Sequence, residues 1–112
     1  MGSTKGKGKK ERGNGVIIAY FSTGYPLEIP SPTRHASMAA AVTAFREFAS
    51  QTQRDYYDEK GTANASLYQF SNDEADAHWQ EAERFAGIGI PFDYPSYVLG
   101  IGKRGGIVTT RC

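Results

Sequence analysis

The sequence predicts an α+β fold, with a mixed α/β arrangement as the alternative, in a single small domain whose elements follow the order β-α-β-α-β-β. One run of residues is apolar on both alternating faces, which indicates a central strand, and two later stretches repeat apolar residues at helical spacing. A chain of 112 residues has the length for one such domain, and its apolar share of 39% is typical of globular proteins. We therefore expect residues 16–112 to form one domain with two helices packed on a mixed sheet, either both on one face or one on each.

The first strand is predicted at residues 16–23, where β-branched and aromatic residues occupy both faces, as in a strand covered on two sides. A turn follows, and residues 27–29 alternate as a short edge strand. Ser31 with Pro32 predicts a helix start, because serine accepts a free backbone N–H and proline at the first helical position loses no hydrogen bond. Ser37 is the competing start.

An amphipathic helix is predicted after this start. Its apolar residues fall on one helical stripe, which consists of Met38, Ala41, Val42, Phe45, Phe48 and Ala49. The pattern allows the helix to continue to Tyr56, and Gly61 is the last residue at which it can stop. The stripe is expected to pack against the sheet.

Residues 66–70 predict another strand, and a second helix begins after them. Ser71 and Glu74 form a capping-box pattern, in which each side chain accepts the backbone N–H of the other residue. The buried stripe of this helix is predicted to consist of Ala75, Trp79, Ala82, Phe85 and Ala86. Gly87 ends the helix, and Ile88 is expected to fold back as a hydrophobic contact.

A β-hairpin is predicted next, with strands at residues 97–101 and 107–110 and a turn at residues 102–106. The turn lies in a glycine-rich stretch, GIGKRGG, that superficially matches a phosphate-binding loop. Such a loop needs a lysine followed by serine or threonine where a strand enters a helix, whereas a strand follows here. We therefore interpret residues 102–106 as a plain turn with exposed cations.

Aromatic residues in or beside loops are numerous, and the chain contains 7 tyrosines. Tyrosine offers a large amphipathic contact area at a low cost in conformational entropy, which favours a protein interface or a base-stacking surface. The predicted interface residues are Tyr25, Tyr56, Tyr57, Phe92, Tyr94 and Tyr97. The alternative is that these rings simply cover the sheet.

Positive charge is concentrated at the N-terminus. Residues 1–15 hold five basic residues and one acidic residue, a net charge of +4, which leaves −3 for residues 16–112. Their glycine-rich, weakly apolar composition predicts a flexible tail, and lysines on such a tail can neutralise phosphates. The residues predicted to contact nucleic acid lie in this tail and in the 102–106 turn: Lys5, Lys7, Lys9, Lys10, Arg12, Lys103 and Arg104.

Two pairs of residues suggest catalysis as a further alternative. His78 and Glu74 lie four residues apart, share a helix face and could act as an acid and base pair or a weak metal site. His35 with Ser37 is the second pair, and Arg34 beside them could help to hold an anion at a helix start. The sequence lacks an HExxH spacing and a cysteine partner for these histidines. It therefore favours a noncatalytic protein and predicts no cofactor and no metal site.

The sequence also indicates where the protein is found. No apolar run approaches the length of a membrane span, and no signal-peptide pattern follows the basic N-terminus. The lone cysteine, Cys112, has no intramolecular disulfide partner. These features predict a protein of the cytoplasm, or of a particle assembled there, without a membrane partner.

The leading hypothesis for function is a noncatalytic structural or accessory subunit of a larger assembly, of virion or ribonucleoprotein type. Its aromatic loops would contact other protein subunits or a second copy of the chain, while the basic tail reaches a neighbour or nucleic acid. A nucleic-acid-binding module that uses the tail and the 102–106 turn is the alternative, and a small enzyme using His78 and Glu74 is the third hypothesis.

Overall fold

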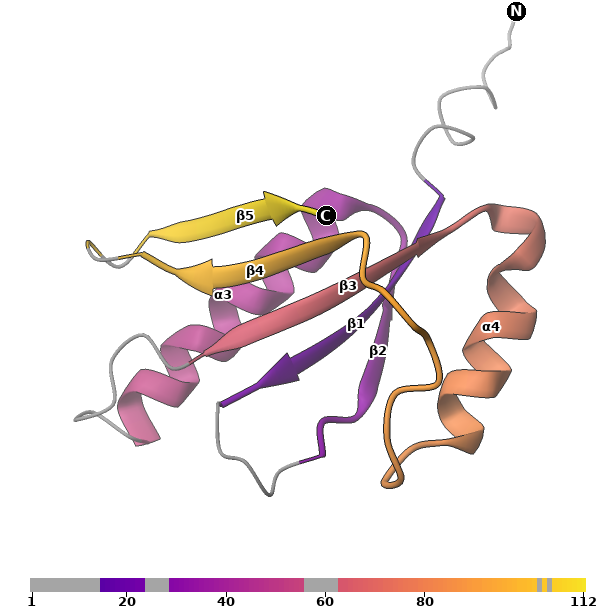
Figure 1. Ribbon diagram of the computed structural model, residues 1–112. Coiled ribbons are helices and arrows are strands. Elements are labelled where there is room, and N and C mark those ends of the chain that lie inside the picture. Colours follow the sequence, from indigo (N-terminus) through magenta and orange to yellow (C-terminus); the bar gives the residue numbers. More distant parts are fainter. Residues whose placement is uncertain (1–14, 24–28, 56–62, 103, 105) are drawn as a thin grey trace, which may run out of the picture.

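The computed structural model describes residues 15–23, 29–55, 63–102, 104 and 106–112. Within them, a five-stranded antiparallel sheet carries one helix on each face (Figure 1). The α+β class predicted from the sequence is confirmed, in one small domain with two helices packed on a sheet. Neither helix of this part of the chain is long and apolar enough to cross a membrane.

The strands lie in the order β2-β1-β3-β4-β5, and every neighbouring pair is antiparallel. Their bounds are β1 Val16–Ser22, β2 Pro32–His35, β3 Asn64–Phe70, β4 Tyr97–Ile101 and β5 Ile107–Arg111. The sequence predicted a mixed sheet, and the difference arises because β2 turns back against β1 before the first helix begins. Strands β2 and β3 therefore flank β1 on its two edges and do not form a parallel pair.

Strand β1 is buried on both faces of the sheet, as its sequence predicted. Ile17 and Ala19 belong to the core that includes residues of α3 (Met38–Asp55), whereas Ile18 and Tyr20 belong to the core that includes a residue of α4 (Asn72–Arg84). Since successive side chains of a strand point to opposite faces, the two helices must cover opposite sides of the sheet.

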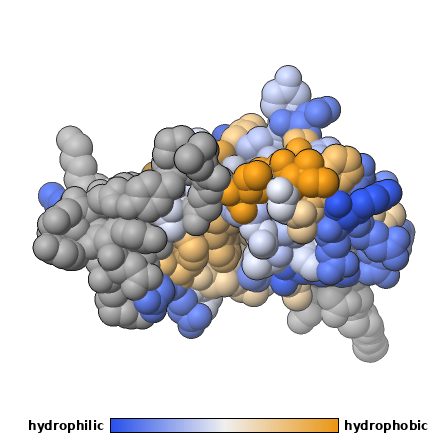
Figure 2. All heavy atoms as spheres, turned by 90° about the horizontal axis from the view of Figure 1, so that it is seen from below, coloured by the Kyte–Doolittle hydropathy of each residue, from blue (hydrophilic) through white to orange (hydrophobic). Residues whose placement is uncertain are grey.

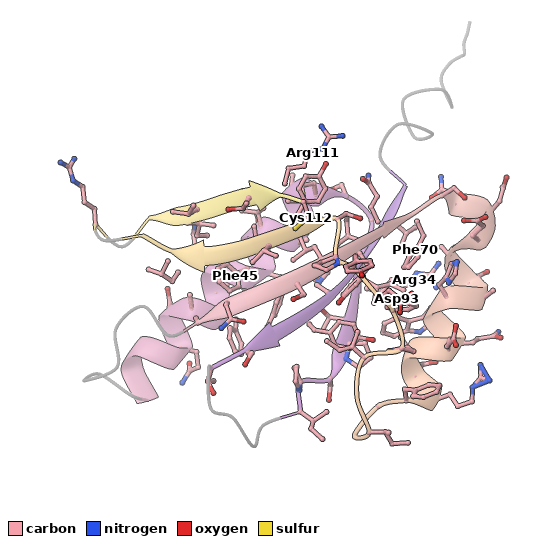
Figure 3. All side chains as sticks on the ribbon, viewed as in Figure 1. Arg34, Phe45, Phe70, Asp93, Arg111 and Cys112 are labelled. Carbon is pink, nitrogen blue, oxygen red and sulfur yellow. The ribbon has the colours of Figure 1, made fainter. Side chains whose placement is uncertain are left out.

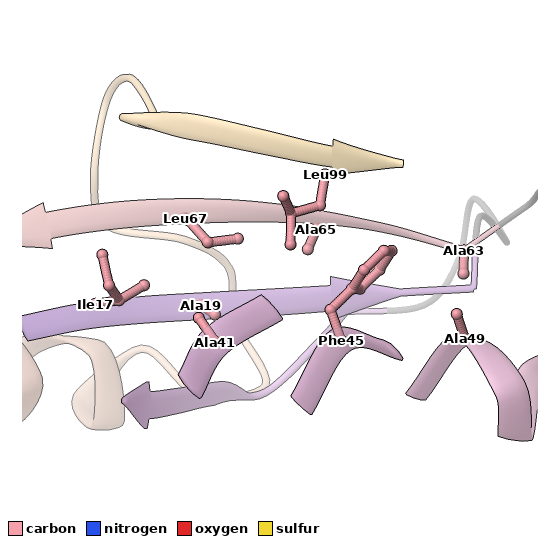
Figure 4. Packing of buried hydrophobic residues seen from close by; sticks show 9 residues of the cluster. All are labelled: Ile17, Ala19, Ala41, Phe45, Ala49, Ala63, Ala65, Leu67 and Leu99. Atoms are coloured by element: carbon pink, nitrogen blue, oxygen red, sulfur yellow. The ribbon is translucent and has the colours of Figure 1, made fainter. Parts of the chain in front are cut away.

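The larger core lies between α3 and the sheet. Its buried members are Ile17, Ala19, Ala41, Phe45, Ala49, Ala63, Ala65, Leu67 and Leu99 (Figure 4). Phe45 points from α3 toward the strands and is fully buried, and the alanines around it let the helix lie close to the sheet. The predicted stripe of α3 is confirmed, because its other members, Met38, Val42 and Phe48, pack against this core while partly buried.

Helix α3 begins after Ser37, which was the competing start. The Ala40 backbone N donates a hydrogen bond to Ser37 Oγ at 3.1 Å, so serine caps the first turn. The predicted start at Ser31 and Pro32 is wrong, because Pro32 is the first residue of β2 and lies opposite Tyr20 of β1. Strand β2 is at the edge of the sheet, where proline is tolerated.

Helix α4 begins after Ser71, as predicted, but without the capping box. The Glu74 backbone N bonds the Ser71 carbonyl oxygen at 3.1 Å, and the Ser71 side chain makes no capping bond. Ala75 and Ala82 are buried, and Trp79 packs against the core that contains Ala82. The remaining predicted members of this stripe, Phe85 and Ala86, are exposed, because the helix ends at Arg84 before they can face the sheet.

Candidate functional site

The connection between α4 and β4 presents apolar side chains to solvent. Ile88 is 70% exposed and Tyr94 is 86% exposed, and Phe85 and Ile90 are also exposed. In Figure 1 this connection is the orange loop that runs below α4 before it rises to β4. We call residues 85–94 the apolar segment.

Local chemistry explains why Ile88 faces outward. After the last helical residue, the backbone N–H groups of Ile88 and Gly89 both bond the Phe85 carbonyl oxygen, at 2.8 and 3.0 Å. Gly87 adopts a positive φ of 81°, which reverses the chain and which a residue with a side chain rarely adopts. The predicted inward contact of Ile88 is therefore wrong, because the reversal points this side chain away from the body.

One face of the molecule carries a band of exposed apolar side chains. Figure 2 views the molecule from below, the side on which the apolar segment lies in Figure 1, and the most hydrophobic spheres form one continuous band there. Isolated exposed apolar residues are ordinary, but a contiguous band bordered by polar residues is typical of an interaction surface.

A cleft of about 350 Å³ lies beside this segment, between β3, α4 and the chain that leads to β4. It is lined by Tyr68, Gln69, Phe70, His78, Glu81, Pro91, Phe92, Asp93, Tyr94 and Ser96. Figure 3 shows Phe70 and Asp93 on the side of the molecule that carries α4. The apolar segment and the cleft share residues 91–94, so they form one continuous surface.

Phe92 fixes the apolar segment to the body. Its ring lies 5.2 Å from the ring of Tyr68 and 5.1 Å from the ring of Phe70, measured between centroids. Phe92, which the sequence predicted as an interface residue, therefore anchors the segment, and it also lines the cleft. Its packing leaves the neighbouring Tyr94 outside, on a backbone that the Phe92 ring holds in place.

Ser96 holds the end of the same connection. Its backbone N bonds the Leu67 carbonyl oxygen at 2.7 Å, and its Oγ accepts a hydrogen bond from the Gln69 backbone N at 3.1 Å. The Cys112 backbone N bonds the Ser96 carbonyl oxygen at 3.0 Å. The segment is thus attached at Phe92 and at Ser96, and its exposed side chains are displayed from a supported backbone.

The charge around the cleft is negative. Glu81 and Asp93 line it, and no lysine or arginine belongs to the described lining. Four further acidic residues are exposed on α4: Asp73, Glu74, Asp76 and Glu83. Asp76 Oδ1 forms an ion pair of 2.8 Å with Arg34 Nη2 of β2, which offsets part of this charge. The surface therefore favours a partner that is apolar and basic.

Of the other predicted interface tyrosines, only Tyr97 is described, and it does not join this surface. Tyr97 lies in β4 and packs against the core beneath α3, on the opposite side of the sheet. Tyr25, Tyr56 and Tyr57 lie outside the described residues.

Most of the residues predicted to contact nucleic acid also lie outside the described residues. These are Lys5, Lys7, Lys9, Lys10, Arg12 and Lys103. Arg104 is described, and it is exposed in the turn between β4 and β5. That turn is at the far end of the hairpin from the apolar segment (Figure 1).

The structure gives His78 a packing role. Its ring stacks on Phe70 with 4.0 Å between centroids and 17° between ring planes, and it also meets the Phe92 ring at 5.9 Å. No hydrogen bond joins His78 to Glu74 among the described contacts. His78 thus packs with the rings that anchor the apolar segment.

His35 and Arg34 point to opposite faces of β2, so they do not form the anion site considered from the sequence. His35 Nε2 lies 2.8 Å from Thr33 Oγ1, and its ring stacks on Phe21. Partial burial lowers the pKa of His35. Ser37 caps α3 and is not paired with His35. In the described part of the chain, no three acidic, histidine or cysteine residues are placed to hold a metal ion.

Sequence reasoning missed Ile88 and Ile90 as surface residues and Glu81 and Asp93 as neighbours of the aromatic cleft. One signal was present: the stretch GIGIP places two isoleucines among glycines and a proline, where neither a helix nor a strand can bury them. The carboxylates carried no comparable signal, because only the fold brings α4 beside the chain that precedes β4.

The chain matches no protein-family model, and comparisons with curated proteins and with solved structures give no significant match.

Proposed function

We propose that this protein is a noncatalytic subunit of a larger assembly and that it docks to another protein through the apolar segment and the adjoining aromatic cleft. The observation that carries this proposal is the contrast within the segment. Ile88 and Tyr94 are 70% and 86% exposed, whereas Phe92 between them is packed against Tyr68 and Phe70. Side chains that are exposed on an anchored backbone are suited to binding.

The energetics favour a docking role. Fully burying an exposed isoleucine side chain is worth roughly 1.5 to 3 kcal/mol. Covering Ile88, which is 70% exposed, therefore contributes most of that amount, whereas Ile90, which is 37% exposed, contributes less. A segment that is already anchored at Phe92 and Ser96 loses less conformational entropy on binding than a free loop does. Aromatic side chains such as Tyr94 are frequent among the residues that dominate interfaces.

The proposed partner offers an apolar side chain or helix for the segment and basic groups near Glu81 and Asp93. An assembly of virion or ribonucleoprotein type accommodates such a subunit. The basic residues of positions 1–15 would supply a second contact, to a neighbouring subunit or to nucleic acid.

Site-specific photocrosslinking in the cells that produce the protein tests this proposal. A photoreactive amino acid at position 88 is expected to form an adduct with one partner protein, and a second substitution, Tyr94→Ser, should weaken that adduct. The matched control places the same photoreactive group at Gln80, which is exposed on α4. Adducts of equal strength from positions 88 and 80, or none from position 88, would show that the apolar segment does not dock.

A further inference from the structure

Strand β5 is an open edge of the sheet. It is last in the strand order, and no described residue pairs with its outer side. Four of its five residues are β-branched, it contains no proline or lysine, and residues 108–111 are exposed. Proteins usually protect such edges with prolines, charges, a covering helix or a very short strand, and an unprotected edge is a template for another strand.

The opposite edge of the sheet shows the contrast. Strand β2 has four residues, begins with Pro32, and Arg34 within it is paired with Asp76 of α4. Strand β5 lacks each of these features in the described structure. The outer edge of β5 is therefore the one suited to pairing.

The hydrogen bonds of the hairpin show which groups of β5 are directed outward. The Gly102 N bonds the Gly106 carbonyl oxygen at 2.7 Å, and the Cys112 N bonds the Ser96 carbonyl oxygen at 3.0 Å. Bonded and non-bonded pairs alternate along an antiparallel ladder, so the two bonded residues of β5 between these ends are Val108 and Thr110. The remaining residues, Ile107, Thr109 and Arg111, direct their backbone N–H and C=O groups away from β4.

We propose that β5 pairs with β5 of a second copy of this chain, antiparallel and with Thr109 opposite Thr109 of the second copy. In this register Ile107 lies opposite Arg111 of the second copy, and each facing pair exchanges two hydrogen bonds. All outward backbone groups of the three residues are then satisfied. A shift by two residues would leave one outward residue of each strand unpaired.

The side chains of β5 fit this arrangement. Arg111 is the only charged residue of the strand, and the register separates the two copies of Arg111, so like charges do not meet. Val108, which is 51% exposed, lies opposite Thr110 of the second copy on the closely spaced, non-bonded pairs. The sequence of β5 is thus complementary to itself.

The pairing joins two sheets into one and leaves the apolar segment free. In Figure 1 β5 lies at the upper edge of the sheet, whereas the apolar segment lies below α4. This inference rests on the hairpin alone, so it holds or fails independently of the docking function proposed above. Together, the two surfaces would give each dimer two docking sites.

Disulfide trapping tests the register. In a Cys112→Ser background, Thr109→Cys places two cysteines on facing residues whose Cα atoms are about 5.5 Å apart, within the range of about 4.4–6.8 Å for disulfides. A covalent dimer is expected in a glutathione buffer. The control is Val108→Cys in the same background, because the two copies of residue 108 would be diagonal neighbours about 7–8 Å apart. Equal trapping at both positions would overturn the register.

Sedimentation of the full chain tests the pairing itself. We expect a dimer for the unsubstituted protein and a monomer for Thr109→Lys, because two lysines would face each other across the pair. Thr109→Pro is the second variant, since it removes only an outward N–H and leaves the bonds to β4 in place. Circular dichroism establishes that each variant is folded. A monomeric unsubstituted protein overturns the proposal, and the edge is then covered by residues 1–14, by a strand of another protein or by nothing. A dimer that persists in both variants overturns it as well.

Discussion

The rings of Tyr20 and Tyr68 meet edge to face, with 5.9 Å between their centroids and 89° between their planes. They lie on the neighbouring strands β1 and β3, beneath α4. Tyr20 is only 2% exposed, and its hydroxyl has no hydrogen-bond partner among the described residues. Burial, with a smaller contribution from Tyr68, raises the pKa of Tyr20 to about 12. This hydroxyl therefore costs stability instead of adding to it.

We expect Tyr20→Phe to leave the free energy of unfolding at pH 7 unchanged or to raise it by up to about 1 kcal/mol, because an unpaired buried hydroxyl is removed and the ring stays. Urea unfolding followed by circular dichroism measures the change. Tyr68→Phe is not an equivalent variant, because Tyr68 lines the cleft. A loss of more than about 1 kcal/mol in Tyr20→Phe would mean that the hydroxyl is hydrogen-bonded.

The same hydroxyl makes stability depend on alkaline pH. In the unfolded chain Tyr20 loses its proton near its ordinary value of 10.0, whereas the folded chain holds it to about 12. Between these values the unfolded state binds fewer protons, so stability falls as pH rises above 10, by about 1 to 3 kcal/mol. Unfolding experiments from pH 8 to 12 should show this fall, and Tyr20→Phe should make it shallower. Burial also raises the pKa of Tyr68, so part of the fall will remain in the variant.

The two helix starts give a matched comparison. Ser37 Oγ accepts the Ala40 backbone N–H at 3.1 Å, whereas the Ser71 side chain makes no capping bond. Ser37→Ala should lower the free energy of unfolding by about 1 kcal/mol, and Ser71→Ala should change it by less than about 0.5 kcal/mol. Urea unfolding of the two variants in parallel measures both changes in the free energy of unfolding. Equal losses would show that both serines cap their helices in solution.

These serines also show how far the sequence predicts the structure. Ser31, Ser37 and Ser71 all precede plausible helices, and local chemistry alone makes them equally good candidates for the residue that caps a helix N-terminus. Pairing with β1 decides the first case, because Pro32 lies opposite Tyr20 and begins a strand. Such pairing joins residues far apart in the chain, so no local pattern reports it.

Elements with a strong periodic pattern were predicted correctly for a physical reason. Ile17 and Ile18 are both buried because strand β1 has a helix over each face, and a strand apolar on both faces is the expected signature. The apolar segment has no such period. Its exposure depends on α4 ending at Arg84 and on Phe92 packing on β3, which are properties of the assembled fold.

Phe45 and Phe85 are equally apolar but differ in how deeply the fold buries them. Both belong to helical stripes in the sequence, but Phe45 is fully buried whereas Phe85 is 36% exposed after the end of α4. Phe45→Ala should lower the free energy of unfolding by about 3 to 5 kcal/mol, and Phe85→Ala by less than about 1 kcal/mol. Urea unfolding measures both. If Phe45→Ala does not fold, Phe45→Leu should lower the free energy of unfolding by a smaller amount that still exceeds the loss in Phe85→Ala. A larger loss in Phe85→Ala than in the Phe45 variant would contradict the placement of α3.

The nucleic-acid hypothesis leads to a prediction about salt. If residues 1–15 provide most of the contact, the affinity for a single-stranded oligonucleotide should fall steeply between about 50 and 200 mM salt. Deletion of these residues should abolish most of the binding, because they carry a net charge of +4 whereas residues 16–112 carry −3. Fluorescence anisotropy measures the dissociation constant at each salt concentration. Unchanged binding after the deletion would exclude the tail as the source of affinity.

Arg104 can contact a phosphate directly under this hypothesis, because it is exposed in the turn between β4 and β5. Arg104→Ala should weaken binding modestly and lower the salt slope by about 0.7, the value for one phosphate contact on a single strand. Arg46→Ala, an exposed arginine on α3, is the control and should change neither quantity. A contact to phosphate alone is independent of base sequence, so oligonucleotides of different sequence should lose affinity equally. A loss confined to one sequence would instead indicate that Arg104 contacts a base.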